Sequence, residues 1–124
     1  AIVLYTQKDK KWILATVSPA GHARMAQVAQ EHTDDWRGLG VSLLHRLIIE
    51  DLLGCKDMPK PSYVHLIEEV ADGLKTGEFP LAAVVMPATV DHVRQISMGV
   101  ERMPAKSTYF YPKLLSGLVI NPLE

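Results

Sequence analysis

Cysteine is nearly absent from this sequence, because Cys55 is the only one among 124 residues. A single thiol cannot form a disulfide within the chain, which excludes a disulfide-stapled secreted scaffold and fits a reducing compartment. We expect Cys55 to be an inert small side chain beside a helix end rather than a reactive thiol. The cysteine content therefore predicts a cytoplasmic protein.

Net charge and long apolar runs are also lacking. The formal net charge is −1, which provides no long-range field to attract nucleic acid or an anionic membrane. No uninterrupted apolar stretch approaches the roughly 18 residues that a membrane-spanning helix needs, and the N-terminus does not read as a secretory signal. We therefore predict a soluble protein that binds neither nucleic acid nor membrane.

Motifs for metal binding and catalysis are missing as well. The five histidines include no His-x-His or His-Glu-x-x-His pattern, and none has a cysteine at metal-binding spacing. The glycines match neither the phosphate-binding loop nor the dinucleotide fingerprint. The sequence thus predicts no metal site, indicates no cofactor and leaves any catalytic residue unknown.

What is present is the composition of an ordinary globular domain, with 48% hydrophobic and 22% charged residues. A chain of this length is close to the commonest domain size, so we expect residues 1–124 to form a single domain. The sequence opens directly into "AIVLYT" without an initiator methionine. We expect it to be a fragment of a longer protein, and the family resemblance described below implies that it is the C-terminal fragment.

The pattern of apolar residues and turn residues predicts alternating strands and helices. A hairpin is expected from "AIVLYT" and "WILATVS", followed by a short helix after Ser18 and Pro19 and a loop to residue 37. Further helices are predicted over 41–54, 68–77 and 89–101, and further strands over 61–67, 79–87 and 116–123. The predicted class is α+β, a mixed sheet of about five strands with three or four helices packed on it.

Two of these helices show an apolar face at helical spacing. In the first, Gly54 stands where a left-handed C-cap residue belongs, and the predicted core residues are Val41, Leu44, Leu47, Ile48 and Leu52. In the second, Thr89 is the expected N-cap, and the predicted face consists of Val90, Val93, Ile96 and Val100.

The stretch with the most residues suited to ligand binding is "ERMPAKSTYFYPK", residues 101–113. Its cations, hydroxyls and flat rings suit a phosphate or carboxylate next to a planar group. The candidate anion- or ligand-binding residues are Arg102, Lys106, Ser107, Thr108, Tyr109, Tyr111 and Lys113. The competing interpretation is a strand that packs its tyrosines on the core. Pro104 and Pro112 each lack a backbone donor, which favours an exposed loop.

The same stretch carries a resemblance to a known family. "GVSLLHRLIIEDLLG" and "MPATVDHVRQISMGVERMPAKSTYFYPKLLSGLVINPLE" resemble the C-terminal portion of domain-of-unknown-function family 1015, whose bacterial and archaeal members are several times longer. The resemblance covers essentially the whole chain, and "ERMPAKSTYFYPKLLSGLVINP" is its most specific part. The family itself is uncharacterised.

The resemblance implies two functional hypotheses. In the first, the chain is a non-catalytic C-terminal domain that contributes a binding or partner surface, with the N-terminal remainder of the same protein as a partner and self-association left open. In the second, it is part of a phosphotransferase or hydrolase similar to the ParB and sulfiredoxin group. That enzyme would act on a small amino-acid-type substrate, and Lys106 would contact a phosphorylated or nucleotide ligand. The Gly-x-His-Arg type segment of such enzymes has no match here, because the only His-Arg pair, His45-Arg46, lies in a predicted core helix.

Overall fold

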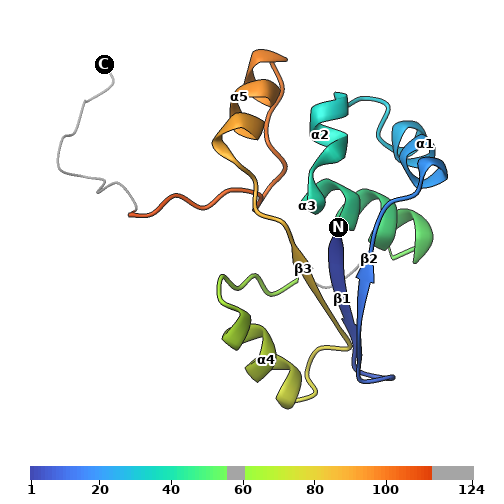
Figure 1. The fold of residues 1–124 in the computed structure, drawn as a ribbon, viewed down its shortest axis with the longest axis vertical. Helices are drawn as coiled ribbons and strands as arrows, with labels where there is room; N and C mark the ends of the chain where they lie inside the picture. The colour runs from blue at the N-terminus through green and yellow to red at the C-terminus, as the bar shows by residue number, and fades with distance from the viewer. Residues whose placement is uncertain (56–60, 113–124) are drawn as a thin grey trace, which may run out of the picture.

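A computed structural model describes residues 1–55 and 61–112 (Figure 1). Three antiparallel strands, β1 (Ile2–Thr6), β2 (Lys11–Ala15) and β3 (Leu81–Val85), form a sheet in the order β2-β1-β3. The helices α1, α2, α3 and α5 gather at one end of the sheet, and α4 lies beside its other end (Figure 1).

The predicted hairpin is confirmed. Strands β1 and β2 pair with Leu4 opposite Ile13 and Tyr5 opposite Trp12. Residues 7–10 form the turn, which is closed by a 2.8 Å bond from the Lys10 backbone N–H to the Thr6 carbonyl. Lys10 adopts a left-handed backbone conformation with φ of 51°, which glycine or asparagine normally occupies in such turns.

The prediction of a mixed sheet with about five strands is wrong, since the sheet of the described residues has three strands and is antiparallel throughout. Residues 61–66 form neither strand nor helix. There the Glu69 carboxylate accepts the backbone N–H groups of His65 and Leu66, each at 3.0 Å. Strand propensity reflects fit to a neighbouring strand, and none of the three strands in residues 1–55 and 61–112 pairs with this stretch. The predicted strand over 116–123 lies outside the described residues.

The helices are α1 (Pro19–Val28), α2 (Asp34–Gly38), α3 (Gly40–Ser42), the π-helical segment η1 (Leu43–Leu52) that continues α3, α4 (Ile67–Lys75) and α5 (Val90–Met98). Ser18 caps α1 and Thr33 caps α2 through their side-chain oxygens. Helix α2 replaces part of the predicted loop. It forms because Thr33 accepts the N–H of Trp36, whose indole is buried in the core. No helix among the described residues has the length and apolar character to cross a membrane.

The core lies between one face of the sheet and the helices at its end. Its buried residues come from β1, α1, α2, η1, α5 and the connections between them: Ile2, Met25, Ala29, Trp36, Leu39, Leu43, Leu47 and Ile96. Leu4 and Val85 pack against this cluster from the sheet. Since side chains alternate along a strand, Tyr5 and Trp12 point to the opposite face.

The prediction for the helix over 41–54 is partly wrong. Leu47 is buried and Gly54 is left-handed with φ of 66°, as predicted. Val41, Leu44 and Ile48 are only partly buried, and Leu52 is 67% exposed. In a π-helix the backbone hydrogen bonds join residues five apart rather than four apart. Residues four apart in sequence therefore do not lie on the same side of the helix.

The face predicted for α5 is also partly wrong, because Ile96 is fully buried while Val90 and Val100 are exposed. Helix α5 packs on α2 beyond the end of the sheet (Figure 1), so one narrow stripe suffices to reach the core. Val100 lies past the helix end with φ of 56°, which turns its side chain away.

Replacing Thr89 with alanine is expected to destabilise the protein by about 0.5–2 kcal/mol. The Thr89 hydroxyl accepts the His92 N–H at 3.3 Å, and the His92 ring accepts the Thr89 backbone N–H at 3.1 Å. Alanine removes the first of these bonds and leaves the His92 N–H at the helix start without its acceptor. Ser97→Ala on the exposed side of the same helix is the control, and urea unfolding measures both. Equal stability of the two variants would contradict the capping role.

Candidate binding segment after helix α5

The binding segment predicted from the sequence begins with a sharp reversal of the chain. The Glu101 N–H donates to the Ile96 carbonyl at 3.1 Å, and the Val100 N–H donates to that of Ser97 at 3.0 Å. This is the Schellman pattern, in which the left-handed position is usually glycine. Val100 occupies it at φ of 56°, a conformation that is strained for a β-branched residue. The turn directs the chain back toward α2.

Glu101 fixes the start of the segment to the loop between α1 and α2. One carboxylate oxygen lies 2.5 Å from His32 Nδ1. The other accepts the Thr33 hydroxyl at 2.5 Å and the Thr33 backbone N–H at 3.2 Å. The His32 ring stacks on the Trp36 indole with centroids 3.6 Å apart and planes 6° apart. The Glu101 side chain is only 14% exposed, so this anchor is held inside the fold.

Two opposing effects act on the pKa of Glu101. Burial raises it, because desolvation disfavours the carboxylate. The hydrogen bonds from Thr33 and His32 favour the carboxylate and outweigh burial, so the pKa lies below its usual value. Glu101 is therefore a charged acceptor at neutral pH, and His32 and Thr33 are its donors.

The anchor continues into a charged network on η1. His32 Nε2 lies 3.5 Å from a Glu31 oxygen, and Glu31 pairs with Arg46 at 2.7 Å. Arg46 also pairs with Glu50 at 3.0 Å. Side chains from three separate stretches of chain, at residues 31–32, 46–50 and 101, thus pair with one another, which fixes the position where the segment leaves the fold.

Beyond this anchor, Met103 packs against the core and the chain then turns outward. The Ser107 hydroxyl donates to the Pro104 carbonyl at 2.7 Å, and Lys106 occupies the turn with φ of 60°. Ser107 therefore closes a turn, which removes its hydroxyl proton from ligand binding. Among the described residues, 101–112 form neither helix nor strand, so the loop expected from Pro104 and Pro112 is confirmed.

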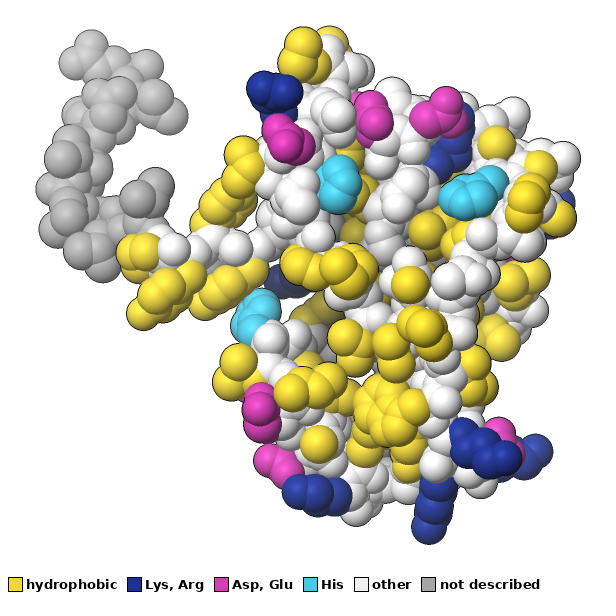
Figure 2. Space-filling model, viewed as in Figure 1, with side chains coloured by type: hydrophobic (Ala, Val, Ile, Leu, Met, Phe, Trp, Pro, Cys, Tyr) yellow, Lys and Arg dark blue, Asp and Glu magenta, His cyan; other side chains and the backbone are white. Residues whose placement is uncertain are grey.

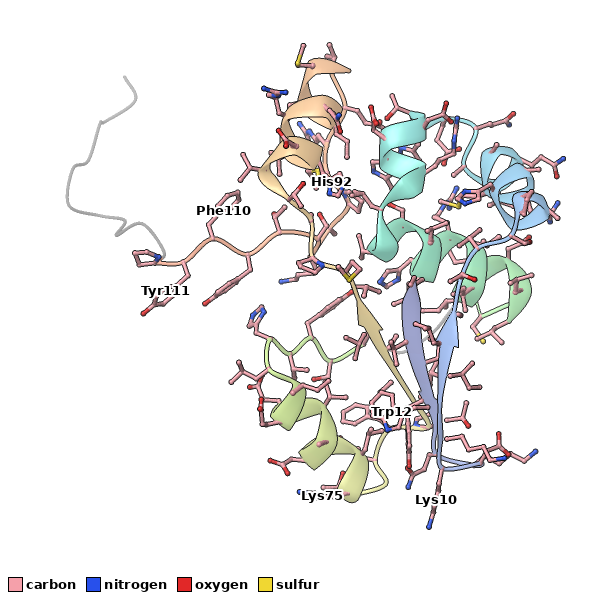
Figure 3. All side chains as sticks on the ribbon, viewed as in Figure 1. Lys10, Trp12, Lys75, His92, Phe110 and Tyr111 are labelled. Atoms are coloured by element: carbon pink, nitrogen blue, oxygen red, sulfur yellow. The ribbon has the colours of Figure 1, made fainter. Side chains whose placement is uncertain are left out.

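The other predicted site residues are exposed, namely Arg102, Lys106, Thr108, Tyr109 and Tyr111. Tyr109 contacts the His65 ring at a centroid distance of 4.1 Å, and Tyr111 is 84% exposed. Phe110 and Tyr111 point to opposite sides of the extended chain (Figure 3). Lys113 lies outside the described residues. The structure thus places six of the seven candidates along one projecting segment, five of them exposed, without gathering them around one point.

Sequence reasoning missed the residues that hold this segment. Glu101 was seen only as part of the stretch, and His32, Thr33 and His65 received no role. His32 and Glu101 are 69 positions apart, and no local pattern reports a contact at such a separation. The available signal was modest: a threonine before Asp34 and Asp35 reads as a helix N-cap.

Comparisons with known proteins add no relative. No family model matches the chain, and neither a curated protein nor a solved structure is found to match it. In residues 1–55 and 61–112, no three side chains of histidine, cysteine, aspartate or glutamate come together as metal ligands. The resemblance to family 1015 stays a prediction.

Proposed function

We propose that the chain is a non-catalytic binding domain, and that residues 102–111 are its contact segment. The observation that carries this proposal is that one end of the segment is anchored to the fold while the side chains beyond it are exposed. Glu101 and Met103 fix the segment at one end, while its aromatic rings and cations beyond them are left exposed. Figure 2 shows hydrophobic side chains covering the part of this segment that adjoins the grey residues.

Three consecutive exposed rings suit a protein partner better than bulk water. Tyr109, Phe110 and Tyr111 each expose more than half of their surface. Aromatic and arginine side chains are the residues that most often dominate binding energy at protein interfaces. Lys106 and Arg102 form no ion pair with another described residue, so they are available to a partner surface that carries carboxylates.

The partner that we propose is the N-terminal remainder of a longer cytoplasmic polypeptide. The resemblance to a family of much longer proteins supports this choice. The alternative, a contribution to phosphoryl transfer upstream, rests on Lys106 and Thr108 as phosphate contacts. It is the weaker candidate, since Ser107 is already bonded to Pro104.

Limited trypsin digestion tests the proposal directly. Trypsin cleaves after lysine, and Lys106 is an exposed residue in the turn that follows the anchored Glu101 and Met103. We expect rapid cleavage there in residues 1–124 and strong protection in the protein that the complete gene encodes. Cleavage between Lys10 and Lys11 in the hairpin turn serves as the internal reference. Equal cleavage rates after Lys106 in both samples would overturn the proposal.

Lys106→Ala is expected to lower the melting temperature of the complete protein while leaving that of the isolated chain nearly unchanged. The reason is that the lysine contributes only through its partner, and a partner stabilises the state that it binds. Lys8→Ala, which removes an exposed lysine from the hairpin turn, is the matched control. A loss that is the same in both proteins would assign Lys106 to folding instead.

A further inference from the structure

A separate cleft lies between the hairpin and helix α4. Its volume is about 380 Å³, and its lining residues are Tyr5, Gln7, Lys10, Trp12, Ala71, Leu74 and Lys75. In Figure 3, Trp12 lies between the hairpin and α4, with Lys10 and Lys75 at the same end of the molecule. Small-molecule sites usually occupy about 300–1,000 Å³, so the cleft is large enough for one ring and its substituents.

Two aromatic rings line the cleft. Tyr5 and Trp12 are cross-strand partners, with ring centroids 5.0 Å apart and planes tilted by 53°. They lie on the face of the sheet opposite the core, and Trp12 remains 50% exposed. Aromatic rings favour offset stacking or edge-to-face contact with another ring. The exposed half of Trp12 therefore offers a surface to a planar ligand.

Two lysines mark one end of the cleft. Lys10 projects from the hairpin turn and Lys75 from the last turn of α4 (Figure 3). Lys75 already pairs with Asp72 at 2.8 Å, whereas Lys10 forms no ion pair with another described residue. Lys10 also holds a left-handed backbone conformation that glycine adopts without strain. This conformation belongs to the tight hairpin turn, which places Lys10 in the lining of the cleft.

Gln7 provides a hydrogen-bond acceptor. Its backbone N–H donates to the Pro80 carbonyl at 2.9 Å, which fixes the residue against the strand connection. Its side-chain Oε1 atom is covered and has no hydrogen-bond partner. A covered acceptor without a donor is rare in folded proteins. Gln7 lines the cleft, and because the last side-chain torsion of an amide is broad, a ligand with an N–H group in the cleft can supply the missing donor.

We propose that this cleft binds a small molecule made of a planar aromatic ring with an N–H donor and an anionic substituent. The ring stacks on Trp12, the N–H donates to Gln7, and the anion lies between Lys10 and Lys75. A phosphate and a carboxylate both satisfy two ammonium groups, so the shared chemistry is an anion on a flat ring. The site is independent of the contact segment at residues 102–111.

The two tryptophans allow a direct NMR test. Trp12 is half exposed in the cleft, whereas Trp36 is buried in the core, so the two indole N–H signals provide a reporter and an internal control. We expect titration with adenosine monophosphate, indole-3-acetate or both to shift the Trp12 signal saturably and leave that of Trp36 in place. A response to adenosine monophosphate alone identifies a phosphate ligand, and a response to indole-3-acetate alone identifies a carboxylate ligand.

Lys10→Gly separates binding from folding. Glycine relieves the left-handed strain, so the variant keeps the hairpin, while the loss of the cation weakens binding roughly tenfold or more. Lys8→Ala in the same turn is expected to leave the affinity unchanged. The proposal is overturned if neither probe shifts Trp12, if Lys10→Gly binds as tightly as the natural chain, or if inorganic phosphate binds as tightly as adenosine monophosphate.

Discussion

Replacing Leu47 with alanine is expected to lower the free energy of unfolding by about 2–5 kcal/mol, as large-to-small changes in packed cores do. Leu47 is 5% exposed and belongs to the core cluster. Its truncation removes apolar contacts from the junction of α1 and η1, which no neighbouring side chain can refill without a shift of the backbone. Urea unfolding monitored by circular dichroism measures the change.

Leu52→Ala is the matched control, since it makes the same chemical change on the same helix. Leu52 is 67% exposed, so its truncation is expected to cost about 0.5 kcal/mol or less. A regular α-helix would align Leu44, Ile48 and Leu52 in one row. If Leu52→Ala proved as costly as Leu47→Ala, that regular register would hold and the π-helical assignment would be wrong.

Glu101→Gln is expected to destabilise the protein by about 1–3 kcal/mol at neutral pH. The glutamine amide preserves the shape of the side chain, but its NH₂ group faces the donors on Thr33 or His32. Glu78→Gln, at an exposed carboxylate outside this network, is the control. Its stability is expected to change by less than about 0.5 kcal/mol.

The difference in the free energy of unfolding between Glu101→Gln and the natural chain is expected to become smaller at acid pH. Because folding lowers the pKa of Glu101 below its ordinary value of 4.5, its stabilising effect is complete above that pH. It is lost as the pH falls through the lower pKa of the folded state. Chemical unfolding of both proteins across this range measures the difference, and other carboxylates cancel because both chains share them. A difference that stays constant down to full protonation would show that the charge of Glu101 is immaterial.

Several elements of the fold could be predicted from residues that are close together in the sequence. The Ser18-Pro19 start, the Thr89 N-cap and the left-handed Gly54 could be predicted because capping depends on residues within one helical turn. The hairpin was readable for the same reason, since its two strands adjoin in sequence. The loop character of residues 101–112 followed from the fixed geometry of its prolines.

Contacts between residues that are far apart in the sequence could not be predicted from it. Residues 61–67 have strand-like composition, but a strand needs a partner, and no strand in the described part of the chain pairs with them. The π-helical register of η1, which exposes Leu52, depends on what packs against the helix and not on its own spacing. The candidate residues of the contact segment were named from the sequence, while the Glu101 anchor that positions them was not.

The sequence by itself determined the α+β class, the starts of several helices, and the stretch in which aromatic rings and cations gather. Only the tertiary structure decided that Ser107 closes a turn, that Glu101 meets His32 and Thr33, and that Tyr5, Trp12, Lys10 and Lys75 line an open cleft. The physical reason is the distance along the sequence over which each kind of interaction acts. Backbone capping and turn preferences act over a few residues, whereas burial and charge pairing depend on which distant segments the fold brings together.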